Sequence, residues 1–228
     1  MCGYEDVYGT YFRAYANFGA CSKLRVCSMT GCAFNALTNQ DCFSQARSCS
    51  HSFEMCDKAG CPMFLNDEQK QLALDIGTRL IQRGESVAVA ESSAGGLISA
   101  ALLSVPGASR YYAGGGVVYT LASRTALAGV SAEQYANYRG TTPQMLGTLA
   151  ESMRLRLGAT WCIAESGLAG PTGSRFGALA GKVTVGVAGP VERVEASETG
   201  LSDREANMVE FSIRALRLLC QVIQEADD

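Results

Sequence analysis

The stretch Ser86–Gly96, with the sequence SVAVAESSAGG, decides the fold of this chain. Its first half, Ser86–Glu91, is short and apolar, which is typical of a strand buried on both faces. Its second half, Ser92–Gly96, is small and glycine-rich, and a helical pattern begins directly after it with Leu97 and Ile98. A buried strand that turns directly into a helix predicts one unit of an α/β layered sheet.

Start and stop signals predict three further helices on either side of this unit. The first begins at a capping box in residues 66–69 and ends at Gly84. The second begins at Thr142-Pro143, with proline at the first helical position, and ends at Gly158. A second capping box in residues 202–205 begins a long terminal helix.

Three more short apolar segments predict strands, at Gly114–Thr120, Thr160–Glu165 and Lys182–Ala188. Helices therefore alternate with strands through the second part of the chain. This alternation predicts an α/β fold in which helices cover both faces of the sheet. We assign residues 64–228 to this domain.

Residues 1–63 form a different kind of sequence, with no sustained helical or strand period. Eight of the ten cysteines lie before Met63, at Cys2, Cys21, Cys27, Cys32, Cys42, Cys49, Cys56 and Cys61. Their spacing contains no Cys-x-x-Cys pair, which disfavours zinc. A disulfide framework fits the even number, but disulfides belong to oxidising compartments and nothing directs export. The remaining interpretations are a poorly ordered extension, or an overlong start with Met63 as the true beginning.

Composition excludes several classes of protein. The 228 residues carry a net charge of −3 with scattered charges, whereas proteins that bind a nucleic-acid backbone usually present a basic face. No run of about eighteen apolar residues is present, so no membrane partner is expected. The N-terminus lacks a basic start followed by an apolar stretch, so a cytoplasmic location is expected.

Three loops rich in small residues lie where a ligand of an α/β sheet would bind, beyond the carboxyl ends of strands. In Glu91–Gly96, small residues are expected to leave the backbone N–H groups of Ala94, Gly95 and Gly96 open to an anion or a developing oxyanion. A plain glycine-rich turn is the alternative. Ser166–Gly173 contains three glycines and a proline, which suits close approach by a ligand, although a flexible loop explains it equally. Tyr119-Thr120 ends a strand, where tyrosine often packs as a wedge.

A nucleophilic serine in these loops needs a proton acceptor. The single histidine, His51, lies in the extension, so a Ser-His-Asp triad is not expected. Lysine with a lowered pKa serves this purpose in Ser-Lys hydrolases. After Phe64 the chain contains only Lys70 and Lys182.

These loops, in this order, resemble the CinA carboxy-terminal domain family over about residues 66–226. The family's Ala-Glu-Ser-Cys-Thr-Gly-Gly corresponds to AESSAGG at 90–96, and its Val-Thr-Tyr-Ser-Asn-Glu-Ala-Lys to VVYTLASR at 117–124. Its Ser-Gly-Ile-Ala-Gly-Pro corresponds to SGLAGP at 166–171, and its Gly-Asp-Arg to SDR at 202–204. A Pro-Gly-Ser/Ala-Ser turn is matched by PGAS at 106–109.

The resemblance implies a three-layer α/β/α sandwich with a mixed or mostly parallel sheet, assembled into a homo-oligomer. It also implies hydrolysis of nicotinamide mononucleotide to nicotinate mononucleotide and ammonia, with a small-molecule pyridine nucleotide as partner and with no cofactor and no metal. The implied catalytic residues are Ser92 as nucleophile, Tyr119, and Arg124 at the position of the family's base. The implied substrate-binding residues are Glu91, Ala94, Gly95, Gly96, Thr120, Ser166, Gly167, Gly170 and Arg204.

Arg124 is the most informative departure from the family pattern, because lysine stands there in the family. An arginine stays protonated in proteins and is a poor proton acceptor. Ser93 and Ala94 also replace the family's Cys and Thr. Two hypotheses follow: an amidohydrolase with a substitute base, for which Lys182 is a candidate, or a catalytically impaired relative that binds a nucleotide-like ligand or serves as an assembly partner.

Overall fold

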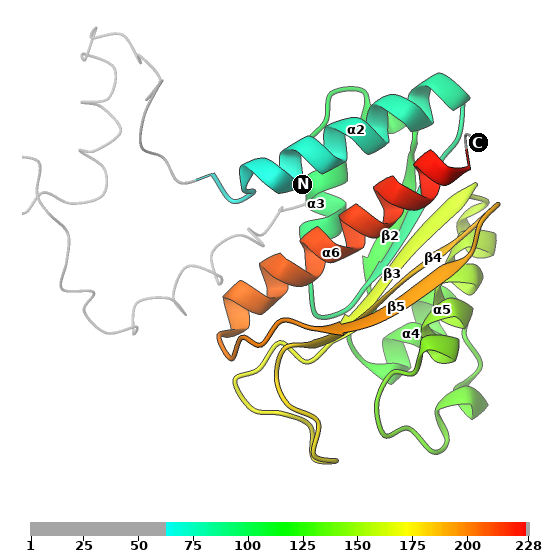
Figure 1. Cartoon of the computed structure of the whole chain (residues 1–228). Coiled ribbons are helices and arrows are strands. Elements are labelled where there is room, and N and C mark those ends of the chain that lie inside the picture. The colour runs from blue at the N-terminus through cyan, green and yellow to red at the C-terminus, as the bar shows by residue number, and fades with distance from the viewer. Residues whose placement is uncertain (1–62, 227–228) are drawn as a thin grey trace, which may run out of the picture. The chain divides into compact units, whose positions relative to one another are not determined.

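The computed structural model describes residues 63–226, which form a five-stranded sheet with helices on both faces (Figure 1). The strand order is β2 (Tyr112–Val117), β1 (Val87–Glu91), β3 (Trp161–Gly167), β4 (Lys182–Ala188) and β5 (Arg193–Glu198). Strand β1 pairs in parallel with β2 and β3, whereas β4 pairs antiparallel with β3 and β5. The prediction of a mixed α/β sheet is confirmed.

Side-chain size along the strands separates the two faces of the sheet. Large side chains such as Val89 and Ile163 join the core under α2 (Asp67–Arg83), α3 (Leu97–Leu103) and α6 (Arg204–Glu225). The alternate positions, such as Ala90 and Ala164, are small and let α5 (Pro143–Leu157) pack closely on the other face, beside α4 (Leu121–Ala128). Two short 3₁₀ helices, Ala108–Arg110 and Ala132–Tyr135, complete the elements. The three layers of the predicted sandwich are visible in Figure 1.

The predicted helix signals act as expected, with one correction. Asn66 accepts a hydrogen bond from Gln69 N at 2.9 Å and donates from its own N to Gln69 Oε1, so the first capping box is present. Thr142 caps α5, and Gly84 and Gly158 end their helices in the left-handed conformation. At α6 the cap is Asp203, which accepts from Ala206 N at 2.8 Å, rather than the predicted box beginning at Ser202.

Helix α4 and strand β5 were not predicted, and the bounds of two predicted strands differ from those observed. Helix α4 begins right after Thr120, whose side chain caps it, so the chain leaves the sheet after Val117 and not at Thr120. Strand β5 is largely exposed, and its sequence RVEASE contains no run of apolar residues. No apolar pattern therefore indicated a strand there. Strand β3 runs on to Gly167 because its end pairs with the beginning of β4, with Gly167 opposite Val183.

The predictions for residues 1–62 (the cysteine-rich extension, zinc, disulfides and His51) lie outside the described residues. Within residues 63–226, no helix is long and apolar enough to cross a membrane. The same residues contain no group of three or more His, Cys, Asp or Glu side chains placed to hold a metal ion. Cys162 and Cys220 are free and buried in the core.

Candidate functional site

Parallel pairing of β2, β1 and β3 brings the three predicted loops together at the carboxyl edge of the sheet. Val118 N donates to Glu91 O at 2.7 Å, which joins the end of β2 to that of β1. Ser93 Oγ donates to Gly167 O at 2.6 Å and accepts from Gly167 N at 3.2 Å, which joins the turn after β1 to the end of β3. The turn Ser92–Gly96 therefore lies between the other two loops, an arrangement that follows from the central place of β1 between β2 and β3.

Glu91 serves as the N-terminal cap of α3. Its Oε2 accepts from Gly96 N at 2.9 Å and Ile98 N at 3.1 Å, and its Oε1 accepts from Ser99 N and Ser99 Oγ. A carboxylate at this place satisfies helix N–H groups that have no partner inside the helix and complements the helix dipole. The carboxylate is fully buried, so the expectation that Glu91 binds substrate is replaced by a role in holding α3.

A second buried carboxylate, Glu165, fills the turn itself. Its Oε2 accepts from Ser92 N at 3.0 Å and from Ala94 N at 2.8 Å, while Gly95 N donates to Ser92 O at 3.2 Å. The N–H groups of Ala94, Gly95 and Gly96 are thus all engaged within the protein. The prediction that they are open to an oxyanion is wrong, because Glu165 accepts from Ala94 N, Glu91 accepts from Gly96 N, and the backbone carbonyl of Ser92 accepts from Gly95 N.

Sequence reasoning missed Glu165, although a signal was present. It is the single charged residue in the apolar predicted strand Thr160–Glu165, and it directly precedes Ser166. Burial of the side chain raises the pKa of this carboxyl to about 7, against the lowering effect of the Ala94 and Ser92 N–H groups. Within residues 63–226, its second oxygen, Oε1, is buried and has no hydrogen-bond partner. A buried acid that titrates near neutrality marks a candidate functional group.

Ser92 stands apart from the other polar groups of the turn. Only 4% of the residue is exposed, yet its hydroxyl makes no hydrogen bond to any residue in the described part of the chain. The neighbouring Ser93 hydroxyl, in contrast, donates to Gly167 O and accepts from Gly167 N. The hydroxyl of Ser92 is therefore free to act on a bound molecule.

Arg124 is almost completely buried and donates to three oxygen atoms. Its Nε donates to Val118 O at 3.3 Å, and its two terminal nitrogens donate to Thr141 Oγ1 at 3.1 Å and to Ser166 Oγ at 2.7 Å. The guanidinium also lies over the ring of Tyr135, 5.9 Å from its centroid. A guanidinium accepts no proton, so Arg124 is a source of positive charge beside Ser166 and not a base.

The hydroxyls beside Arg124 form a connected group. Thr141 Oγ1 lies 2.8 Å from Ser166 Oγ and 3.0 Å from Tyr138 Oη. Because Arg124 donates to two of these oxygens, the hydroxyl hydrogens remain available to donate to one another and to an acceptor outside the group. Sequence reasoning found Ser166 but missed Thr141 and Tyr138, whose loop carries no motif.

Arg204 brings Tyr119 and Gly170 together in a second polar group. One terminal nitrogen of Arg204 donates to Gly170 O at 2.7 Å, and the other lies 3.5 Å from Tyr119 Oη. Tyr119 is 56% exposed, so it does not pack as a wedge inside the core. Thr120 is committed to capping α4, where it accepts from Ser123 N at 3.1 Å. The predicted residues therefore fall into two polar groups.

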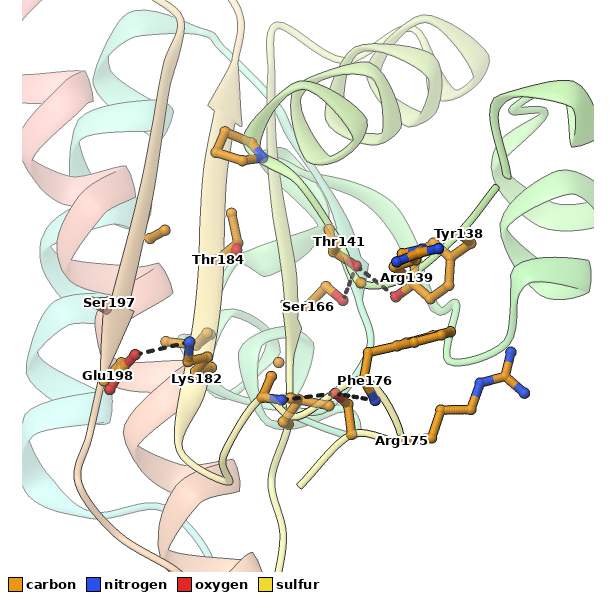
Figure 2. Close-up of a pocket in the computed structure, with 18 residues that line it drawn as sticks. Tyr138, Arg139, Thr141, Ser166, Arg175, Phe176, Lys182, Thr184, Ser197 and Glu198 are labelled. Carbon is orange, nitrogen blue, oxygen red and sulfur yellow. Dashed lines mark hydrogen bonds and ion pairs between the residues drawn. The ribbon is translucent and has the colours of Figure 1, made fainter. Parts of the chain in front are cut away.

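A cavity of about 510 Å³ opens beside the Ser166 group, over the sheet face near the N-terminus of α5 (Figure 2). Ser166, Thr141 and Tyr138 lie close together on its wall, and Phe176 lies between them and Arg175. Ser92, Tyr119 and Arg204 do not line this cavity. The residues that line it are Tyr138, Arg139, Gly140, Thr141, Pro143, Ser166, Gly167, Leu168, Ser174, Arg175, Phe176, Ala178, Lys182, Val183, Thr184, Ala196, Ser197 and Glu198.

Lys182 also lines this cavity, but its surroundings do not suit a base. Its Nζ lies 3.2 Å from Glu198 Oε1, and 47% of the lysine side chain is exposed. A lysine that acts as a base requires burial or neighbouring positive charge, whereas Lys182 is about half exposed and faces a carboxylate. The hypothesis that Lys182 replaces the family's lysine is therefore not supported by its contacts.

Comparison with known proteins agrees with this architecture. A family model described as the CinA C-terminal domain matches residues 69–223. A CinA-like protein of Prochlorococcus marinus is 38% identical over 154 residues, which is 68% of this chain and 33% of that relative. A CinA-like protein of Acidobacterium capsulatum is 41% identical over 125 residues, 55% of this chain and 30% of that relative. The chain thus spans about a third of the length of these curated relatives.

Solved structures give the same result at the level of the fold. A CinA superfamily protein from Klebsiella pneumoniae superposes with a TM-score of 0.65 at 25% identity, covering 69% of this chain and 98% of that one. The competence/damage inducible protein CihA from Agrobacterium tumefaciens gives a TM-score of 0.65 at 26% identity, covering 72% and 99%. Nearly the whole of each of these proteins corresponds to the α/β domain described above.

Proposed function

Since this chain belongs to the CinA family through its C-terminal domain, we propose that the domain is an amidohydrolase of a pyridine mononucleotide. The proposed reaction converts nicotinamide mononucleotide and water to nicotinate mononucleotide and ammonia, with Ser92 as the nucleophile. The proposal takes its substrate from the resemblance of the loops at 90–96, 117–124, 166–171 and 202–204 to the family's pattern.

The observation that carries the proposal is the state of the Ser92 hydroxyl. Two carboxylates and Ser93 hold the backbone of its turn in place, but nothing in the described residues binds the hydroxyl itself. A positioned and unengaged hydroxyl at the carboxyl edge of a parallel sheet is suited to attack a bound carbonyl carbon. A serine with only a structural role would be expected to use its hydroxyl as Ser93 does.

The two polar groups beside the turn supply complementary contacts for such a substrate. Arg124 and the hydroxyls of Ser166 and Thr141 present positive charge and donors, which suit a developing oxyanion. Arg204, held by Gly170 O and near Tyr119, offers a charged donor for a phosphate. The engaged N–H groups of Ala94, Gly95 and Gly96 have no part in this arrangement.

Ammonia release from nicotinamide mononucleotide tests the proposal directly. We expect the full chain to release ammonia and Ser92→Ala to be slower by at least about 10³-fold, as is typical for loss of a nucleophile. Ser109→Ala, which removes an exposed hydroxyl, is the matched control and should keep the parent rate. Equal rates for Ser92→Ala and the parent chain would contradict the proposal.

A second candidate function, binding without turnover, is favoured by Arg124. The family's base position here holds a buried cation that donates to Ser166, Thr141 and Val118. In this case titration calorimetry would show binding of the mononucleotide by the full chain, no ammonia would form, and Arg124→Lys would stay inactive. Binding too weak to measure would contradict this second function.

A further inference from the structure

The proposed nucleophile needs a proton acceptor, and most basic groups in the described residues are unsuitable. Arg124 keeps its proton. Lys182 is paired with Glu198 at 3.2 Å, and Lys70 lies on α2, where it is paired with Asp67 at 3.3 Å. The turn around Ser92, however, encloses the two carboxyl groups of Glu91 and Glu165.

These two carboxyl groups differ in how many of their oxygens are engaged. Both oxygens of Glu91 accept hydrogen bonds, from N–H and O–H donors at the start of α3. Glu165 accepts through Oε2 alone, and its buried Oε1 has no partner among residues 63–226. Burying a carboxyl oxygen without a hydrogen-bond donor lowers the stability of the folded state. Its presence therefore indicates a purpose other than stability.

Glu165 is also held against the residue that needs an acceptor. Its Oε2 is 3.0 Å from the nitrogen of Ser92, and the Ser92 hydroxyl is attached through Cβ to the Cα next to that nitrogen. Rotation about the Cα–Cβ bond of Ser92 moves the hydroxyl among three staggered positions, with no change in the backbone. The 2.8 Å bond from Ala94 N to the same Oε2 fixes the carboxyl group on this side of the turn.

We propose that Glu165 is the proton acceptor of Ser92, with Oε1 as the receiving atom. This inference rests on the proposed function for its reaction, and it gives Glu165 the task that Arg124 cannot perform. Arg124 then stabilises charge and Glu165 moves the proton.

Burial, more than any charged neighbour, brings the proton affinity of Glu165 near the value that a base requires. Burial and the negative charge of Glu91 raise its pKa, whereas the Ala94 and Ser92 N–H groups and the positive charge of Arg124 lower it, leaving it at about 7. A base with a pKa near the working pH combines a useful ionised fraction with proton affinity.

The proposed proton transfers return Ser92 and Glu165 to their starting states at the end of each turnover. The Ser92 Oγ–H proton passes to Glu165 as Oγ bonds to the carboxamide carbon, and the carbonyl π electrons move to its oxygen. The tetrahedral intermediate collapses, the C–N bond breaks, and the nitrogen leaves as ammonia with the proton from Glu165. Water then gives a proton to Glu165 and attacks the ester carbon, and Ser92 Oγ leaves and recovers that proton. The net change is carboxamide plus water to carboxylic acid plus ammonia.

Covalent labelling of Ser92 by an alkyl fluorophosphonate tests the acceptor without relying on the substrate. The full chain is incubated with the probe from pH 5 to pH 9, and the labelled peptide is quantified by mass spectrometry. We expect the labelling rate to rise with a midpoint near pH 7 and then to level off, because ionised Glu165 activates Ser92. An absent label on Ser92, or a rate without this midpoint, would overturn the inference.

Glu165→Gln provides the matched comparison, because its amide oxygen can still accept from Ser92 N and Ala94 N. Labelling should fall by about 10²-fold or more and lose the midpoint. Glu195→Gln, on the exposed face of β5, should label as the parent does. Labelling of Glu165→Gln at the parent rate would overturn the inference. Labelling that depends on Glu165, together with no ammonia from nicotinamide mononucleotide, would leave the inference standing and contradict the proposed substrate.

Discussion

At the scale of single residues, Glu165 connects stability to pH. Its pKa is raised from about 4.5 to about 7 in the folded chain, so between these pH values the folded state binds more protons than the unfolded state. The free energy of unfolding should therefore fall as the pH rises through this window, by about 3 kcal/mol from this group. Ionisation of Glu165 therefore lowers the free energy of unfolding of the domain.

Denaturant unfolding at pH 5 and pH 8 checks this prediction. Glu165→Gln should lose most of the decrease in stability between the two pH values that the parent chain shows, because glutamine does not titrate. Glu195→Gln, an exposed site, should keep the decrease. The account of Glu165 would be wrong if both variants followed the parent chain equally.

Ser93 provides a residue-scale test of the turn. Its buried hydroxyl both donates to and accepts from Gly167, joining the turn after β1 to the end of β3. Ser93→Ala removes both hydrogen bonds and leaves Gly167 O and N without these partners, so stability should fall by about 1–3 kcal/mol. Ser109→Ala should change stability by less than about 0.5 kcal/mol, and denaturant unfolding of both variants measures the difference.

At the scale of elements, α3 depends on a single carboxylate. Glu91 accepts four hydrogen bonds from Gly96, Ile98 and Ser99, and α3 has no other side-chain cap at its N-terminus. Glu91→Gln removes the charge and one acceptor oxygen, so amide hydrogens of α3 should exchange about ten-fold faster or more. The amides of α5, which Thr142 caps, should exchange at an unchanged rate. Equal acceleration in both helices would contradict a local role.

Two glycines should respond to alanine with opposite signs. A Cβ at Gly167 would lie 2.5 Å from Phe211 Cε2 and 2.8 Å from Lys182 O, so Gly167→Ala should destabilise the domain by about 1–3 kcal/mol. A Cβ at Gly147, inside α5, would meet only Val194 at 3.6 Å. Gly147→Ala should therefore stabilise the domain by up to about 1 kcal/mol through helix propensity. Thermal unfolding distinguishes the two, and the same sign for both would contradict the packing described for β3.

The same scale shows why sequence reasoning located some elements and missed others. Valine-rich Val87–Glu91 and capped α2 and α5 carry strong local signals, and they were predicted within a few residues. Strand β5 carries none, because it is an exposed edge strand fixed by pairing with β4. Tertiary pairing, which no local pattern encodes, determined this element.

At the scale of the whole molecule, the position of the candidate site followed from topology. Three parallel strands place their carboxyl ends at one edge, so the segments that follow Glu91, Val117 and Gly167 had to meet there. The role of Glu165 there could not be predicted, because it fills the turn through contacts with Ser92 and Ala94, which are distant from it in sequence. A glycine-rich turn that looked open to an anion is filled by the protein's own carboxylates.

In the proposed reaction, the Ser92 hydroxyl, left free by its turn, attacks the carboxamide carbon. Rapid acid quenching of the full chain with nicotinamide mononucleotide, followed by peptide mass spectrometry, tests it most directly. We expect a nicotinoyl nucleotide ester on the peptide that contains Ser92, formed during turnover and absent from Ser92→Ala. Ammonia release with no ester on that peptide, or with the ester at another residue, would contradict it.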